Sequence, residues 1–221
     1  AIGKEALAAQ NFTTATNSYN VAVGAFAGNV ITTGVQNTLI GSNNAIDLIS
    51  GNYNTTLGYL ALYEDQYGSN SVAVGYGALQ NQRFTTAANA ENVAVGYSAG
   101  NSVSTGTANT LIGSYAGDSI TTGLDNACLG YKAADQMTSG RFNVAIGTQA
   151  LGRETIGDRS IAIGYQSGYY QVSDSNNEEA QNVYVGMYSG HYNVTGKFNV
   201  AMGYQALMGN STNSADSNVA I

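Results

Sequence analysis

The sequence predicts an all-β fold: a parallel β-solenoid of the β-roll type, with coils of seventeen residues and two short strands in each coil. Three observations predict it. A glycine-terminated pentapeptide recurs along the whole chain, most copies lie seventeen positions apart, and side-chain types alternate strictly within each copy. A short fixed period built from one small unit is typical of stacked coils.

The pentapeptide is best seen as Asn-Val-Ala-Val-Gly at 20–24. Its glycine returns at 41, 58, 75, 96, 113, 130, 147, 164, 186 and 203, while the chain opens on Ala1-Ile2-Gly3 and closes on NVAI at 218–221. Eight of the eleven intervals span seventeen positions, and the other three are longer by four or five. Most units carry a second glycine ten residues after the first, so two glycine turns separate two short segments.

These intervals predict one repeat domain over residues 1–221, of about twelve coils. Because the repeat is cut at both ends, we expect a fragment of a longer chain. The longer units predict insertions at 8–19, 80–91, 169–181 and 208–217. A tandem duplication is also visible, since residues 3–74 align without gaps on 75–146 and QNFTTATN at 10–17 matches QRFTTAAN at 82–89.

Alternation with period two predicts which side chains share a face of the strand. The residue before each glycine is a large aliphatic, as in Val23, Ile40 and Leu57, and the residue two earlier is Val, Ile, Thr or Ala. We expect both to point inward as the core. The residue between them is mostly Ala, so we expect an outward column of small residues that serves as a subunit interface. A second small column, from Ala6 to Ala206, follows the glycine.

Two further columns are polar or aromatic. The residue four before the glycine is Asn in ten of twelve units and Ser in two, Ser71 and Ser160, which predicts a ladder of stacked amides. Tyr follows the glycine directly at 59, 76, 97, 131, 165 and 204. Such a ladder covers a flat sheet, and it is also a surface on which sugar rings stack.

Composition excludes several classes. The 221 residues contain no Pro, one Cys, 28 Gly and only 21 charged side chains, with a net charge of −7. The lack of Pro indicates that nearly every backbone N–H is needed as a donor. Seven scattered Lys and Arg give no basic surface for nucleic acid. No apolar run has the roughly 18 residues of a membrane span.

We find no catalytic residues, no cofactor site and no metal site in the sequence. His191 has no second His or Cys nearby, so we expect an incidental surface imidazole. Cys128 stands in a small-residue column, which favours a packed thiol over a reactive one. The acidic residues fall in turns rather than across a predictable cleft.

The repeat N-x-A-[IV]-G-Y-x-A-[GL] resembles the head repeats of YadA-type trimeric autotransporter adhesins, and it resembles more closely the repeats of long tail fibres in marine and other tailed phages. The resemblance covers essentially the whole chain. It implies a left-handed roll and a homotrimer. The longer coils, the many Tyr and the lack of a neck and anchor depart from the adhesin pattern and favour the phage fibre.

This resemblance implies a structural shaft and adhesion segment of a virion tail fibre, extracellular, with other fibre or virion proteins and a cell-surface glycan or protein receptor as partners. Neither nucleic acid nor membrane insertion is expected. Loops on a rigid scaffold usually carry recognition. The insertion at 169–181 combines adjacent tyrosines with three carboxylates, so our candidate recognition residues are Tyr169, Tyr170, Asp174, Glu178 and Glu179.

Three alternatives remain open at this stage. The chain could be the head of a bacterial trimeric autotransporter adhesin on the outer-membrane surface, binding host or matrix surfaces. It could bind ice through Thr33, Thr105, Thr122 and Thr195, although Ser50, Tyr67, Ser139 and Ile156 interrupt that ladder. It could be a β-helical polysaccharide lyase, although no acidic or basic cluster supports catalysis.

Overall fold

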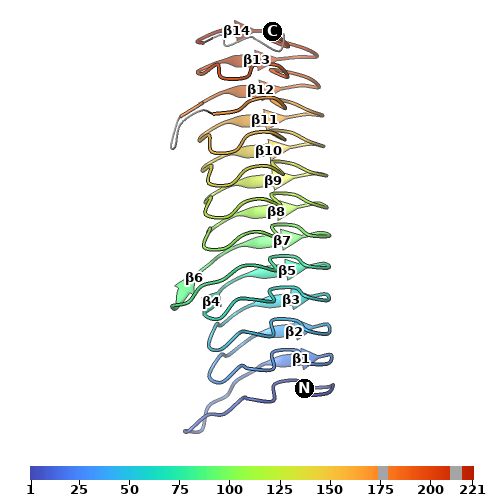
Figure 1. The fold of residues 1–221 in the computed structure, drawn as a ribbon, viewed down its shortest axis with the longest axis vertical. Helices are drawn as coiled ribbons and strands as arrows, with labels where there is room; N and C mark the ends of the chain where they lie inside the picture. Colours follow the sequence, from blue (N-terminus) through green and yellow to red (C-terminus); the bar gives the residue numbers. More distant parts are fainter. Residues whose placement is uncertain (174–178, 210–215) are drawn as a thin grey trace.

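The structure is a computed structural model that describes residues 1–173, 179–209 and 216–221. Within these residues there is no helix, and the chain forms an upright parallel β-solenoid with its termini at opposite ends (Figure 1). The predicted all-β solenoid is therefore confirmed. Twelve strands form one sheet and are joined by eleven turns of the coil, which at about 4.8 Å per step gives a rod about 53 Å long.

Successive strands of the large sheet all pair in parallel, each with the strand of the next coil. The sheet consists of β1 (Val21–Val23), β2 (Thr38–Ile40), β3 (Thr55–Leu57), β5 (Val72–Val74), β7 (Val93–Val95), β8 (Thr110–Ile112), β9 (Ala127–Leu129), β10 (Val144–Ile146), β11 (Ile161–Ile163), β12 (Val183–Val185), β13 (Val200–Met202) and β14 (Val219–Ala220). The register places each residue on its counterpart, so that Val23 pairs with Ile40 and Ile40 with Leu57. The constant period of the repeat therefore sets the stacking.

The expectation of two strands per coil is wrong. The segment after each glycine is a series of turns, and its backbone groups bond from coil to coil without forming a regular ladder, as in Leu62 N–H to Ala78 O at 3.0 Å. In the part of the chain that the structure describes, one additional sheet pairs β4 (Gly68–Ser69) with β6 (Ala88–Asn89), and β6 belongs to the insertion at 80–91. Positive φ angles recur at and after each glycine, as at Gly41, Asn43 and Ala45, which explains why the segment cannot be extended.

The predicted direction of the strand side chains is also wrong. In β7 the central Ala94 is fully buried, whereas Val93 and Val95 are only partly buried, and the same pattern holds in the other three-residue strands. The alanine column, which lies two residues before each glycine, is therefore the core. The large aliphatic residues point outward. The second small column, which includes Ala27, Ala78 and Ala99, is also buried inside the roll.

The core is thin because two columns share its volume. The residue four after each glycine is Gly, Ala or Leu, and it meets the alanine column from the opposite wall. Leu39 is buried against Gly28, where an added Cβ would lie 2.6 Å from Leu39 Cδ1. Conversely, Leu62 and Leu79 accompany the small Ala73 and Ala94. Size compensation between facing columns keeps the packing dense in each coil.

The predicted asparagine ladder is confirmed and extended. Asn126 accepts a hydrogen bond from the backbone N–H of Asn143 at 3.0 Å, and its Nδ2 donates to Gly140 O at 2.8 Å. Amide-to-amide bonds are also present, as in Asn126 Nδ2 to Asn109 Oδ1 at 3.0 Å. The asparagines of the middle coils are fully buried, so these bonds satisfy backbone groups that water does not reach.

Candidate functional site

The outward side of the twelve-stranded sheet is an exposed apolar face. We define the outer aliphatic face as the residues one and three positions before each glycine. Its exposed members include Val21, Ile40, Leu57, Ile112, Leu129, Ile161, Ile163, Met202 and Val219, each at least 36 % exposed. Neither column contains a charged residue, and their polar members are Thr38, Thr55 and Thr110. Contiguous apolar patches of this extent mark interaction sites on soluble proteins.

A tyrosine ladder runs along the edge of this face. Tyr76 and Tyr97 stack with centroids 5.1 Å apart and planes 8° apart, and the ladder continues from Tyr59 through Tyr115 to Tyr131. Tyr59, Tyr76, Tyr97 and Tyr131 remain 45 to 49 % exposed. The ladder therefore covers the edge of the sheet and also leaves part of each ring open to solvent.

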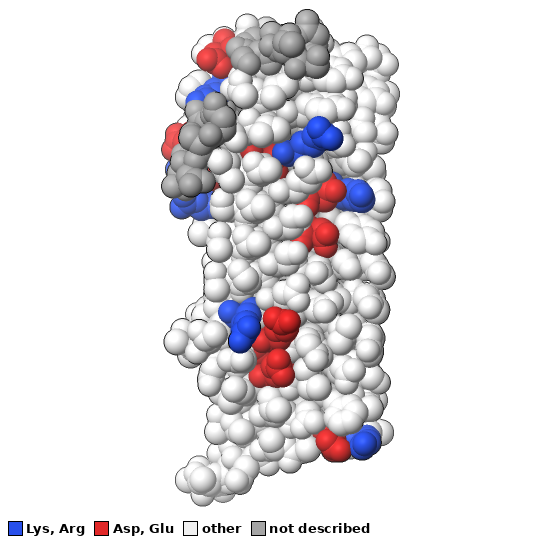
Figure 2. All heavy atoms as spheres, in the orientation of Figure 1, with Lys and Arg blue, Asp and Glu red and all other residues white. Residues whose placement is uncertain are grey.

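Charged side chains lie in small separate groups along the rod, and much of the surface in this view is uncharged (Figure 2). Lys132 Nζ lies 4.0 Å from Asp135 Oδ2, and Arg141 Nε lies 3.6 Å from Asp158 Oδ2. Partial burial raises the pKa of Asp118 and Asp135, and the charge of Lys132 opposes both shifts. These groups form local ion pairs and do not create a charged recognition surface.

Two carboxylates are buried inside the roll, in the column seven residues after the glycine. Asp65 replaces an aliphatic residue and accepts hydrogen bonds from Gln82 Nε2 at 2.6 Å, Gly68 N at 3.1 Å and Phe84 N at 3.1 Å. Burial raises the pKa of Asp65, while these hydrogen bonds lower it.

Glu154 repeats the arrangement. It accepts hydrogen bonds from Gln171 Nε2 at 2.8 Å, from Gly157 N at 2.8 Å and from Ser173 N at 3.2 Å. In both cases the carboxylate binds the residue at which an insertion leaves the roll.

The insertion at 169–181 begins with an aromatic cluster. Tyr169 stacks on His191 at 5.6 Å, Tyr170 stacks on Tyr192 at 5.0 Å, and the Arg153 guanidinium lies 5.0 Å from the Tyr170 centroid. Tyr169 and Tyr170 are half-buried, whereas Arg153 is exposed. The structure therefore brings the two predicted tyrosines together with one cation that sequence reasoning did not include.

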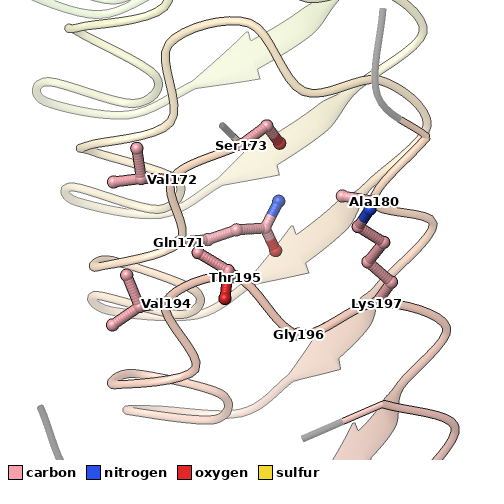
Figure 3. Close-up of a pocket in the computed structure, with 8 residues that line it drawn as sticks. All are labelled: Gln171, Val172, Ser173, Ala180, Val194, Thr195, Gly196 and Lys197. Carbon is pink, nitrogen blue, oxygen red and sulfur yellow. The ribbon is translucent and has the colours of Figure 1, made fainter. Parts of the chain in front are cut away.

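Glu179, the one acidic member of the predicted site that the structure describes, pairs with groups outside this aromatic cluster. Glu179 is exposed and forms an ion pair with Arg159 and a hydrogen bond with Gln181. Asp174 and Glu178 lie outside the described residues. A small pocket beside the insertion is lined by Gln171, Val172, Ser173, Ala180, Val194, Thr195, Gly196 and Lys197. In Figure 3 the Gln171 side chain points between Ser173 and Ala180, and the space suits little more than a water molecule.

The single histidine and cysteine are both structural. His191 is 5 % exposed and its Nδ1 lies 3.0 Å from Gln166 O, so the expected surface imidazole is instead a packed ring. Cys128 is 1 % exposed, in agreement with the predicted packed thiol, and burial raises the pKa of its thiol to about 12. Of the four threonines considered for ice binding, Thr33, Thr105 and Thr122 are exposed and Thr195 is half-buried.

Within the described ranges, no three His, Cys, Asp or Glu side chains come close enough to hold a metal ion. The same residues include no helix long and apolar enough to span a membrane. Comparisons with protein-family models, curated proteins and solved structures gave no match.

Sequence reasoning missed the buried carboxylates, although a signal was present. Asp65 and Glu154 each interrupt an aliphatic column, and each is followed six residues later by the Ser that replaces the usual Asn. One full coil after each acid stands Gln82 or Gln171. The same three substitutions, an acid, a Ser and a Gln, occur together at two insertions, which indicates one shared hydrogen-bonding arrangement.

Proposed function

We propose that this chain is a structural shaft and adhesion segment of a homotrimeric phage tail fibre, extracellular on the virion, which contributes to attachment to the host cell. The observation that carries the proposal is the outer aliphatic face, which extends along the whole rod with no charged residue in its two columns.

The size of this face suits a subunit interface. Twelve strands about 4.8 Å apart, each about three residues wide at about 3.3 Å per residue, give a flat projected area of roughly 570 Å². The relief of the side chains adds to this projected area, which approaches the roughly 800 Å² that specific protein interfaces bury on each partner.

A second copy of this chain is the partner that fits best. The face is straight, its columns repeat at every coil, and an identical face offers the same spacing along the same length. Cyclic assembly lets each copy use one patch in the same way. The repeat resemblance to trimeric fibres supports three copies, with the interface on the aliphatic columns rather than on the buried alanine columns.

Receptor contact, within this proposal, belongs to the insertions. Arg153, Tyr169 and Tyr170 lie together where the insertion at 169–181 leaves the scaffold, and an aromatic cluster with an exposed guanidinium suits a cell-surface glycan or protein. The shaft would hold such contacts, and those of neighbouring fibre proteins, away from the virion.

The test is the mass of the assembly in solution, measured by light scattering after size exclusion and by native mass spectrometry. We expect about three times the 22.8 kDa of one chain. Leu129→Glu, on the exposed side of the central strand β9, should dissociate the assembly because it places a charge in the interface. Thr122→Glu, an exposed position outside the face, is the matched control and should leave it intact. A stable soluble monomer of the unmodified chain would contradict the proposal.

A further inference from the structure

In two of the lengthened coils, a buried glutamine at the start of the insertion bonds to three groups. Gln82 Nε2 donates to Asp65 Oδ2 at 2.6 Å and to Ser71 Oγ at 3.1 Å, and its Oε1 accepts from Asn92 Nδ2 at 2.9 Å. The carboxylate and the hydroxyl both come from the preceding coil, whereas the asparagine belongs to the coil of the glutamine itself.

The second glutamine repeats this pattern with a different acid. Gln171 Nε2 donates to Glu154 Oε2 at 2.8 Å and to Ser160 Oγ at 3.0 Å, and Asn182 Nδ2 donates to Gln171 Oε1 at 3.0 Å. Asp and Glu thus serve the same role, and the Ser follows the acid by six residues in both cases. The arrangement is a repeated docking device between one coil and the next.

Gln10 is the third member of the set, and its amide nitrogen has no partner. The duplication places Gln10 on Gln82, and the insertion at 8–19 includes it as the insertion at 80–91 includes Gln82. Gln10 Nε2 is buried and makes no hydrogen bond. A buried unpaired donor costs free energy, so this atom points to an acceptor that another coil would supply.

The surroundings of Gln10 show which surface that coil would cover. Ala6 and Leu7 pack on the core but are only partly buried, whereas their equivalents Ala78 and Leu79 are fully buried beneath a preceding coil. Ile2, which pairs with Val23 of β1, is 71 % exposed. The N-terminal edge therefore combines an open strand, uncovered core and an unpaired amide.

We propose that the N-terminal edge of the roll docks a β-coil of the same type that presents to Gln10 Nε2 a carboxylate and, six residues later, a serine hydroxyl. The carboxylate would also accept from the backbone N–H of Phe12, the equivalent of Phe84. The Gln10 amide needs an acceptor, so a coil with only aliphatic side chains at these positions is not the expected partner, because it would bury the amide without a hydrogen bond.

The first test uses the existing chain and compares Gln10→Leu with Gln82→Leu. We expect Gln82→Leu to lower the melting temperature by roughly 3 to 8 °C, because it leaves Asp65 and Asn92 without their partner. Gln10→Leu should leave the melting temperature unchanged or raise it, because it removes an amide that has no acceptor. An equal loss in both variants would overturn the proposal.

The second test supplies the coil. A copy of residues 58–72, which contains Asp65 and Ser71, is grafted directly before Ala1. The number of residues from the grafted carboxylate to Gln10 then equals the number from Asp65 to Gln82 in the native chain. The control graft carries Asp65→Leu in the grafted copy only. We expect the carboxylate graft to melt several degrees higher than its control when Gln10 is present, and no such advantage in the Gln10→Leu background.

Hydrogen exchange of the Gln10 side-chain amide gives a readout independent of melting. We expect its protons to be protected more strongly by the carboxylate graft than by the control graft. Equal melting temperatures and equal protection for the two grafts would refute recognition of the carboxylate. These outcomes concern the end of the rod, so they are distinguishable from a failure of the trimer on its side.

Discussion

Leu111 occupies the space that a side chain on Gly100 would need: an added Cβ there would lie 2.6 Å from Leu111 Cδ1. Gly100 has φ +58°, and Leu79, at the equivalent position of the preceding coil, has φ +50°. The backbone at this position therefore accepts leucine, and the side chain of Leu111 is the main obstacle, with Leu79 Cδ2 next at 3.1 Å.

The relationship predicts compensation between the two positions. Gly100→Leu alone should destabilise the fold by about 1 to 3 kcal/mol through overpacking, and Leu111→Ala alone by about 2 to 5 kcal/mol through a cavity. The double variant recreates the native pairing of Leu79 with Ala94 and should recover most of the loss. Urea denaturation of all four chains at one protein concentration measures the coupling, and strictly additive losses would contradict it.

The glycine that ends each pentapeptide predicts a much stricter requirement. Gly113 has φ +129°, and a Cβ there would lie 2.5 Å from the carbonyl oxygen of Gly130 in the next coil. Gly113→Ala should cost about 2 to 4 kcal/mol, because both backbone strain and a backbone clash oppose it. Gly77→Ala is the control, since its φ is +60° and its Cβ would meet only flexible side chains. Thermal unfolding should place this control within about 1 kcal/mol of the parent chain.

The buried carboxyl of Asp65 predicts a pH dependence of stability. Burial raises its pKa above 3.8 in the folded state, so the folded chain holds this proton more tightly than the unfolded chain. The contribution of the protonated Asp65 carboxyl to the free energy of unfolding is complete below pH 3.8 and is lost as the pH rises through the pKa of the folded state. Asp118 and Asp135 act in the same direction.

Asp65→Asn should therefore flatten the fall in stability between about pH 4 and neutral pH. At neutral pH it should also cost about 1 to 3 kcal/mol, because the new amide turns a donor toward Gln82 Nε2. The exposed Asp125→Asn is the control and should keep the slope of the parent. Urea midpoints across this pH range decide the matter, and an unchanged slope in Asp65→Asn would count against the role of burial.

We expect the thiol of Cys128 to be unreactive toward thiol reagents in the folded state. It lies in the alanine column at 1 % exposure, and its pKa of about 12 leaves almost no thiolate near pH 8. A disulfide reagent such as DTNB should therefore label the chain only at the rate of unfolding, and fully in denaturant. Rapid stoichiometric labelling without denaturant would show that the roll opens locally at β9.

The sequence was sufficient for the period, the stacking register and the asparagine ladder, because each depends on a repeat that is visible in one dimension. The sequence led to the wrong assignment of which strand side chains point into the roll. Val93 and Val95 are more hydrophobic than Ala94, so hydrophobicity alone assigns them to the core, yet the roll is too thin to hold them.

The sequence does not show directly which segment packs against the strand. A large strand residue, Leu39, occurs with the small Gly28, whereas the small Ala73 occurs with the large Leu62. This compensation shows that the central strand residue faces another inward column, and it is recognised only when the two segments of a coil are compared. The tyrosines of the candidate site were found by composition. Arg153 was not, because it approaches Tyr170 only after the coils are stacked.

The asparagine ladder gives the rod a polarity along its axis. Along most of the ladder, the amide oxygen accepts a hydrogen bond from the backbone N–H of the following coil, and the amide nitrogen donates to a glycine carbonyl of that same coil, as Asn126 does with Asn143 and Gly140. A folded coil thus presents the amide groups to which the backbone of the next coil binds. Assembly that proceeds from the amino end, as during synthesis on a ribosome, adds one turn at a time to a prepared surface and never has to wait for a distant segment.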